Sequence, residues 1–393
     1  MHTEKKKIVL FGLVVSLYWF ALYTYVPTLS PYAESLGASH KMVGLIVGSY
    51  GFTQMILRLP LGVVSDRLKR RKPFVVVGIF FGLLSALGLW YFSSSVAVLL
   101  FRSMAGVAAS AWVAFSVLFS SYFKGEDAPK ATGILISFTA GGQVVAMLLG
   151  GFFAESSGLN APFLLAVFGA ALGLALSLTL EEEDGEGREP MEVRGLLKIA
   201  RNRNLIIVSG LAVLVQLLTF ATIFGFTPVA ARRIGASGFQ LGLLATLATL
   251  PVVFSSAMSG TLFTDKLGER GTIAVGFLVI AFSAFVIPFV KSVPLLYVTQ
   301  VIGGFGRGMV FPILMGLSIK RVSQEGRATA MGFFQAIYGL GMFIGPTLFG
   351  SLSDWAGLSW GFWTAGFVGL LSALLAVYLI SSPRPESDKV ESK

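Results

Sequence analysis

The first half of this chain returns in its second half at a nearly constant distance. Gly37-Ala-Ser recurs as Gly235-Ala-Ser, 198 residues later, and Gly133 recurs as Gly332, 199 residues later. Further pairs keep this spacing: Gly44 and Gly242, Asp66 and Asp265, Arg102 and Gln300, Gly106 and Gly304, Gly151 and Gly350, Glu155 and Asp354, Gly158 and Gly357. A single offset over so many matches indicates a duplicated half-chain. In an apolar chain, a parallel duplication predicts two homologous helical bundles with a solute pathway between them.

Composition places the chain in a membrane. Hydrophobic residues make up 55% and charged residues only 13%, whereas soluble domains carry about 25% charged residues. A helix needs about 20 apolar residues to cross the hydrocarbon core, and the runs do not alternate as barrel strands do. We therefore predict an all-α integral membrane fold of twelve transmembrane helices in two six-helix bundles, near residues 8–30, 42–64, 73–93, 96–121, 129–153, 160–180, 204–230, 239–263, 271–291, 294–319, 327–351 and 359–381.

The basic residues predict the orientation. If the N-terminus is cytoplasmic, 23 of the 30 Lys and Arg fall in cytoplasmic segments and only 4 in outer loops. This bias predicts a multi-pass protein of the cell membrane with both termini in the cytoplasm. The first apolar segment is too long for a signal peptide, so we expect an uncleaved anchor. The predicted organisation is an N-terminal bundle (1–180), a cytoplasmic linker (181–203), a C-terminal bundle (204–382) and a cytoplasmic tail (383–393).

The linker has two parts of different character. Residues 181–190 are acidic, contain two glycines and end at Pro190, which indicates a loop. Val193, Leu196, Leu197 and Ala200 then repeat at helical spacing beside basic residues. This pattern fits an amphipathic helix on the inner leaflet, with its cations toward anionic lipid, and it fits a plain tether equally well.

The clearest motif runs from Gly62 to Lys72, as Gly-Val-Val-Ser-Asp-Arg-Leu-Lys-Arg-Arg-Lys. It resembles the signature between the second and third helices of the major facilitator superfamily, and the resemblance covers essentially the whole chain. Lys69 stands where that family usually has glycine. The resemblance implies a secondary transporter in which the motif forms a conformational latch, and it identifies these latch residues: Gly62, Asp66, Arg67, Arg70, Arg71 and, in the second copy, Asp265, Lys266, Gly268, Arg270. The basic residues alone would also set the topology.

Two arginines and one carboxylate are candidates for coupling or anion binding. Arg102 lies in the fourth span, within an Arg-x-x-x-Gly motif that resembles the one implicated in proton coupling in this family. Arg307 lies mid-span among glycines, which predicts either close helix approach or an unwound turn. A cation at such depth must face protein or water. Glu34, near the outer face, could titrate if buried. Arg58, close to the inner surface, is expected to snorkel.

The positions of the acidic residues bear on the charge of the substrate. All 20 carboxylates fall in loops, tails or span ends, so the chain lacks the embedded acid carried by many drug–proton antiporters of the resembled family. A purely cationic substrate is therefore disfavoured. The Gly-x-x-x-Gly-Pro element that marks exporters in the fifth helix is present in the eleventh, at Gly341 to Pro346, whereas the fifth has Ala146-Met147 in place of Gly-Pro. This substitution weakens the case for an antiporter.

Polar side chains within the apolar spans predict the cavity wall. An apolar lining with a few hydrogen-bonding groups suits an amphiphilic organic solute. The candidates are Ser16, Trp19, Tyr23, Gln143, Gln216, Thr219, Gln300 and Gln335.

These observations predict a transporter of a small organic solute, with no cofactor, no metal site and no catalytic residue. His2 and His40 are the only histidines, and neither belongs to an acid–base pair at depth. The phosphate-binding loop of ATPases is absent, and the positive charge sits in short loops rather than in a nucleic-acid surface. Proton-coupled export of hydrophobic or amphiphilic compounds by a monomer is the first interpretation. Uptake or exchange of an organic anion or metabolite is the second, and a non-transporting membrane receptor is the alternative of another class.

Overall fold

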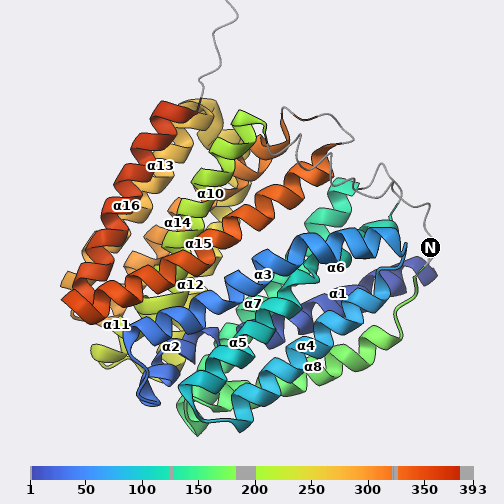
Figure 1. Ribbon diagram of the computed structural model, residues 1–393, viewed down its shortest axis with the longest axis horizontal. Helices are drawn as coiled ribbons and strands as arrows, with labels where there is room; N and C mark the ends of the chain where they lie inside the picture. The colour runs from blue at the N-terminus through green and yellow to red at the C-terminus, as the bar shows by residue number, and fades with distance from the viewer. Residues whose placement is uncertain (1, 124–127, 183–200, 321, 323–325, 381–393) are drawn as a thin grey trace, which may run out of the picture.

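A computed structural model describes residues 2–123, 128–182, 201–320, 322 and 326–380, without the side chains of residues 2–4, 66, 128–130 and 328. Its first half consists of helices joined by short turns (Figure 1). Their bounds are α1 His2–Tyr23, α2 Val26–Ser35, α3 His40–Arg67, α4 Lys72–Tyr91, α5 Ser95–Ser110, α6 Trp112–Ser121, α7 Ala128–Ser157 and α8 Ala161–Leu178. The amphipathic helix predicted after residue 193 lies mostly outside the described residues, as does the tail.

The second half repeats this order. Its elements are α10 Arg203–Ala221, the π-helical turn η2 Thr222–Phe226, α11 Thr227–Arg233, α12 Gly238–Met258, the π-helical turn η3 Ser259–Phe263, α13 Thr264–Val286, the 3₁₀ turn η4 Ile287–Phe289, α14 Val293–Lys320, α15 Arg327–Ala356 and α16 Leu358–Leu379. The first helix of each half is interrupted at the same place, before α2 and before α11. Both continuations have a proline in their first turn, where a missing N–H costs no hydrogen bond.

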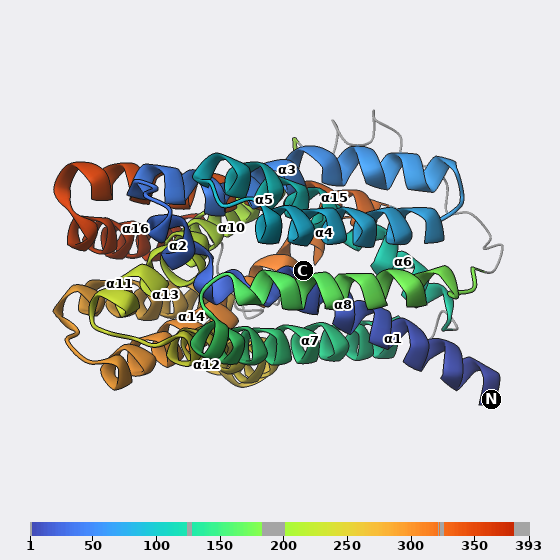
Figure 2. The same ribbon diagram turned by 90° about the horizontal axis from the view of Figure 1, so that it is seen from below.

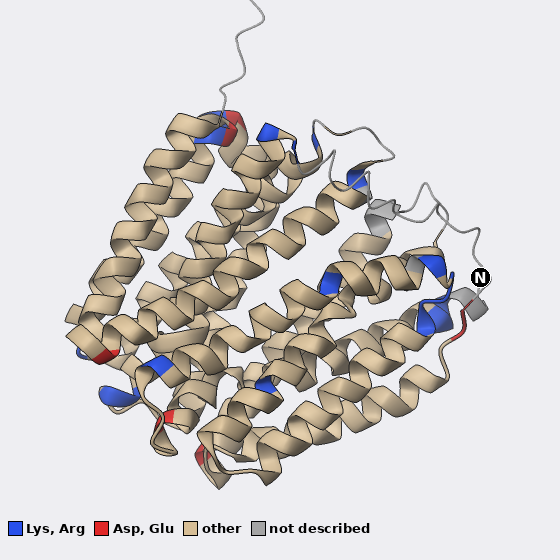
Figure 3. Ribbon diagram, in the orientation of Figure 1, with Lys and Arg blue, Asp and Glu red and all other residues tan. Residues whose placement is uncertain are grey.

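Within the part of the chain that the structure describes, eleven helical segments are long and apolar enough to cross a membrane. One of them, from Gly238 to Phe289, spans 52 residues and joins α12, η3, α13 and η4. The backbone leaves the helical region inside α13 at Gly268, so this segment contains two of the predicted spans. The predicted all-α membrane fold is confirmed. Lys, Arg, Asp and Glu gather at the helix ends and the helices between them carry few charges, as expected of a protein surrounded by lipid (Figure 3).

The two halves of the chain match even in individual backbone φ angles. Six described residues have positive φ, and they form three pairs at the repeat spacing: Gly37 and Gly235, Lys69 and Gly268, Gly158 and Gly357. Lys69 is the position at which the sequence departs from the usual glycine, yet its φ of 51° keeps the left-handed conformation. A side chain in this conformation is strained by contact between Cβ and the following carbonyl.

The backbone strain at Lys69 predicts how substitutions there change the free energy of unfolding. Lys69→Gly should raise the free energy of unfolding by about 1 kcal/mol, because the left-handed region carries no Cβ penalty in glycine. Gly268→Ala, at the matched position with φ 69°, should lower it by a similar amount. Thermal unfolding in detergent checks both variants. A Lys69→Gly protein that unfolds at a lower temperature than the wild type would show that the lysine side chain contributes more than its backbone costs.

The two halves pack tightly at one end of the molecule. We call this the closed end; it contains α2 and α11 and lies away from the N-terminus (Figures 1 and 2). There α3 packs on α15, and α7 packs on α12. A Cβ on Gly44 would lie 2.1 Å from the Pro346 carbonyl oxygen, and one on Gly151 would lie 2.8 Å from Gly242 Cα. Glycines therefore let the backbones of opposite halves touch at the closed end.

The contact between halves changes away from the closed end. Beyond Gly51, Met55 of α3 packs on Gly339 of α15, and Arg58 then contacts Tyr338, about two turns after Gly51. On α7, Gly141 has no described atom within 4 Å of the place its Cβ would take. The opposite end, which holds the N-terminus and is called here the terminal end, thus lacks the glycine-mediated backbone contacts of the closed end among the described residues.

Candidate functional site

Three arginines lie at membrane depth with almost no exposed surface. Arg58 in α3 is 3% exposed, Arg102 in α5 is 4% exposed, and Arg307 in α14 is 8% exposed. None of the three forms an ion pair with a carboxylate within the described part of the chain. A buried cation without a counter-ion is costly, because desolvation is not offset by an opposite charge. Their surroundings therefore decide what these side chains do.

Arg102 is held by tyrosines. Its Nη1 donates to the Tyr25 hydroxyl at 3.1 Å, and its guanidinium carbon lies 4.3 Å from the centre of the Tyr50 ring, a cation–π contact. The break between α1 and α2 carries Tyr25. Gly106, one turn after Arg102, lets α5 approach α3, since its Cβ would lie 2.3 Å from the Tyr50 carbonyl oxygen. The motif's glycine thus brings the arginine over the ring, while Nε keeps no hydrogen-bond partner.

Arg58 does not snorkel, so that expectation is wrong. Its Nη1 donates to the hydroxyl of Tyr338 at 2.9 Å, and Tyr338 belongs to α15 of the opposite half. The reason is that α15 packs against α3 at this level and offers an acceptor within hydrogen-bond distance. Arg58 therefore joins the two halves at membrane depth.

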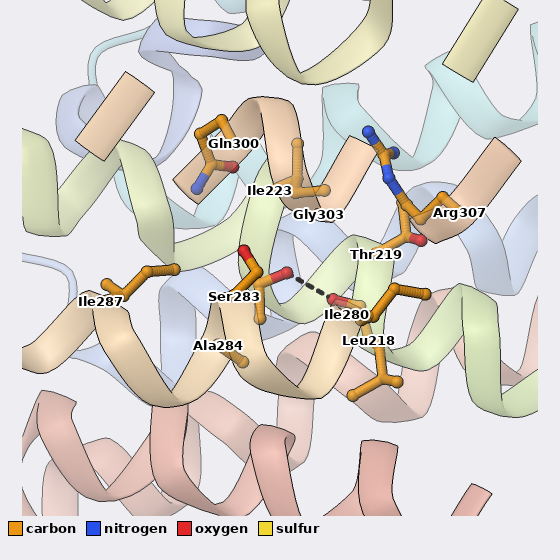
Figure 4. A pocket seen from close by; sticks show the side chains of 11 residues that line it. Leu218, Thr219, Ile223, Ile280, Ser283, Ala284, Ile287, Gln300, Gly303 and Arg307 are labelled. Atoms are coloured by element: carbon orange, nitrogen blue, oxygen red, sulfur yellow. Dashed lines mark hydrogen bonds between the residues drawn. The ribbon is translucent and has the colours of Figure 1, made fainter. Parts of the chain in front are cut away.

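Arg307 lies in an unbroken helix, so close helix approach, not an unwound turn, is observed at this position. Its Nη2 donates to the Ala248 carbonyl of α12, and Nε lacks a partner. Gly304 permits this contact, because its Cβ would lie 2.4 Å from the same carbonyl oxygen. Beside it lies a cavity of about 10 Å³, which is room for about one water (Figure 4). Its polar lining residues are Thr219, Thr222, Ser283, Gln300 and Arg307.

Aromatic rings from both halves meet at the level of Arg102. Tyr23 of α1 packs edge-on against Phe224 of η2, with centroids 6.0 Å apart, and Tyr50 stacks on Phe220 of α10 at 6.2 Å. We call the following set the aromatic–arginine cluster: Trp19, Tyr23, Tyr50, Arg102, Trp112, Phe220 and Phe224. It spans the seam between the halves.

The predicted cavity residues fall into four groups. Trp19 and Tyr23 join the aromatic–arginine cluster, and the indole Nε1 of Trp19 is buried without a partner. Thr219 and Gln300 line the small cavity beside Arg307. Ser16 donates to the Phe138 carbonyl at 3.0 Å, within the first half. Gln143, Gln216 and Gln335 are partly exposed, and their side chains have no hydrogen bond to any described residue. A role in substrate binding stays a prediction for all of them.

The latch predicted around Asp66 also stays a prediction. The Asp66 side chain lies outside what the structure describes. Arg71 Nη1 donates to Ser65 Oγ at 2.7 Å, and the backbone N–H groups of Arg71 and Lys72 point to the Glu182 carboxylate, which caps α4. In the motif's second copy, the side chains of Asp265, Lys266 and Arg270 are exposed and form no hydrogen bond or ion pair with a described residue, while the Gly268 carbonyl accepts from Thr272 Oγ1 at 2.8 Å. In the first copy, Arg67 and Arg70 are exposed, and Gly62 has no described neighbour within 4 Å of its Cβ position.

Sequence reasoning missed the partners of the arginines. Tyr25, Tyr50 and Tyr338 were not singled out, although each is a hydroxyl-bearing ring inside an apolar span. A tyrosine at that depth needs a hydrogen-bond partner, and an arginine at that depth needs an acceptor or a ring. Matching each arginine within a span to a tyrosine within a span would have predicted these contacts. Glu182 was missed because it looked like part of an acidic loop.

A helical membrane protein built from two repeated bundles, with buried cations at their seam, has the architecture of a secondary transporter. The Major Facilitator Superfamily family model matches residues 11–229 and 209–393, which together cover nearly all of the chain. The chain belongs to the Major Facilitator Superfamily. It is therefore a transporter rather than an enzyme or a receptor, and the predicted fold class and family are confirmed.

Individual relatives agree with this assignment. The chain is 25% identical over 348 residues to the uncharacterized MFS-type transporter MJ1560 of Methanocaldococcus jannaschii, covering 85% of this chain and 87% of the relative. It is 31% identical over 157 residues to the quinolone resistance protein NorA of Staphylococcus aureus, covering 40% of each. A mutant of the nucleoside transporter NupG has the same fold, with a TM-score of 0.80, 14% identity and coverage of 95% of this chain and 100% of that one.

Proposed function

We propose that this transporter carries an amphiphilic organic anion by alternating access, with the solute bound at the aromatic–arginine cluster. The observation that supports this most is the absence of a carboxylate partner for Arg58, Arg102 and Arg307 within the described residues. Buried cations without counter-ions attract an anion and repel a cation, and Arg102 places one of them within the cluster itself. The rings of Trp19, Tyr23, Trp112 and Phe224 would take the apolar part of the solute.

The conformation seen in the structure, closed at one end, supports alternating access. The halves touch through glycines at the closed end, and 23 of 30 basic residues favour cytoplasmic placement of the terminal end. We therefore interpret the closed end as the outer face of the cell membrane and the structure as a state closed to the outside. A second state, closed at the terminal end, would complete the cycle.

A second candidate is proton-coupled export of hydrophobic or amphiphilic compounds. The partial similarity to NorA, which is named for quinolone resistance, favours export. The two candidates differ in the charge of the solute and in direction. Because the chain lacks the nucleotide-binding loop, an ion gradient is the energy source we propose for either, and the proton is the coupling ion we propose.

The charge of the solute can be tested with matched probes. Naphthalene-2-sulfonate and (2-naphthylmethyl)trimethylammonium share a ring system and carry permanent charges of opposite sign. In proteoliposomes with an imposed pH gradient, only the sulfonate should be transported, and only the sulfonate should raise the unfolding temperature. Reversing the pH gradient shows in which direction the solute is transported. Transport of the ammonium probe with no response to the sulfonate would overturn the anion proposal and leave the export candidate.

A further inference from the structure

Two carboxylates at the closed end cap helices of the opposite half. Glu155, at the end of α7, accepts a hydrogen bond from the Phe239 N–H of α12 at 3.2 Å. Asp354, at the end of α15, accepts from the His40 and Lys41 N–H groups of α3 at 2.8 and 2.9 Å. A carboxylate is favoured at a helix N-terminus because it meets unpaired N–H groups and the positive end of the helix dipole. We call these contacts the two cross-caps.

The cross-caps are equivalent in the duplicated chain. Glu155 and Asp354 are 199 residues apart, and the helices that they cap begin at Gly238 and His40, 198 residues apart. Each cap joins one half to the other, so each exists only while the closed ends of the two halves are together. Neither can act merely within one bundle. The caps therefore stabilise the closed state, and their hydrogen bonds must break in each transport cycle.

His40 makes the two cross-caps unequal. Its Nδ1 lies 2.9 Å from Asp354 Oδ1, and its Nε2 lies 3.3 Å from Glu34 Oε1 of α2 and 2.7 Å from Arg233 Nη2 of α11. The equivalent position in the other half is Gly238. A side chain cannot stand there, because a Cβ would lie 2.5 Å from the Glu155 backbone nitrogen. Among the described residues, the Asp354 cap thus has a histidine at this position, and the Glu155 cap has none.

The charges around His40 favour its proton in the closed state. The groups that face it are Glu34 from α2, Asp354 from α15 and Arg233 from α11, while the next residue, Lys41, is exposed. Two carboxylates and one guanidinium leave one negative charge, which a protonated imidazole neutralises. With a neutral ring, Nδ1–H donates to Asp354 and Nε2 accepts from Arg233. A protonated ring donates from both nitrogens, so its Nε2–H is directed to Glu34 and the Arg233 hydrogen bond is replaced by attraction between His40 and two carboxylates.

Resting on the proposed function, we propose that His40 is an external proton site that controls opening of the transporter. The cross-caps of Glu155 and Asp354 hold the outer face shut, and a proton on His40 strengthens the Asp354 cap. The sign follows from linkage: the closed state binds this proton more tightly, so acid outside favours the closed state. As the pH rises through the titration of His40, that contribution is lost and the outer face opens more often.

The test measures conformation and needs no substrate. The chain has no cysteine, so spin labels can be placed at Asn160→Cys and Ser292→Cys, two exposed positions on opposite halves. Distances are measured in lipid nanodiscs between about pH 6 and about pH 8.5, where histidine usually titrates. The ratio of open to closed populations should rise about two- to fivefold across this range in the wild type. His40→Gln should remove the pH dependence.

The two acids provide matched variants. Asp354→Asn and Glu155→Gln should each favour the open state by about two- to fivefold, the usual effect of a charge at a helix end. Glu155→Gln should keep the pH response and Asp354→Asn should lose most of it. A pH response that survives His40→Gln would overturn the proton site. Unchanged distances in both acid variants, together with lower unfolding temperatures, would show caps that serve folding alone. A transporter that responds as expected but ignores naphthalene-2-sulfonate would contradict only the proposed substrate.

Discussion

Arg102→Gln should reduce transport of naphthalene-2-sulfonate by about ten- to a hundredfold. A hydrogen bond to a charged group contributes about 1.5–3 kcal/mol, and the glutamine can offer the anion a neutral donor only. The variant should fold as well as the wild type, because the arginine is buried without a counter-ion and its removal relieves a desolvation cost. Initial rates in proteoliposomes and unfolding temperature in detergent check the two expectations.

This combination separates a binding role from a packing role. If Arg102 only held helices together through Tyr25 and Tyr50, the variant would lose stability and transport together. Arg201→Gln is the matched control, because Arg201 is exposed outside the spans and should change neither quantity. Full transport with Arg102→Gln would remove the arginine from the proposed site.

The sequence predicted the fold from features that act over long stretches. Apolar runs and the repeat at 198 or 199 residues need no knowledge of contacts, and the repeat even anticipates the paired turns at Lys69 and Gly268. Orientation rests on a similar sum over many residues. Such signals survive the loss of any one residue, which explains why the twelve spans and the family could be predicted together.

The site was predicted less completely because it depends on pairs that are distant in sequence. Arg58 and Tyr338 are 280 positions apart, and nothing in either local stretch points to the other. The distance of Arg58 from the inner surface predicted snorkelling, and a tyrosine on the opposite half changed that outcome. Glu155 and Asp354 were recognised as a repeated pair near the outer face, but their role as cross-caps appears only when α7 meets α12 and α15 meets α3.

Gly151→Val should abolish transport by preventing the closed end from closing. A Cβ at this position would lie 2.8 Å from Gly242 Cα and 3.0 Å from the Gly238 carbonyl oxygen. Both are backbone atoms of α12, so no side chain can rotate away to make room. Overpacking costs about 1–3 kcal/mol for added methyl groups, which shifts the closing equilibrium about ten- to a hundredfold toward the open state. The spin-label pair at positions 160 and 292 should show long distances, with little change on raising the pH.

The control lies on the same helix. Gly141→Val adds the same atoms to α7 at a place where no described atom lies within 4 Å of the new Cβ, so transport and distances should stay near wild type. If Gly141→Val were equally damaging, the valine would act through α7 itself and not through contact between the halves. If Gly151→Val transported at the wild-type rate, the close approach of Gly151 and Gly242 would not belong to the transport cycle. Loss of transport in Gly151→Val alone, with folding intact, would tie outer closure to two glycines that the duplication places on opposite halves.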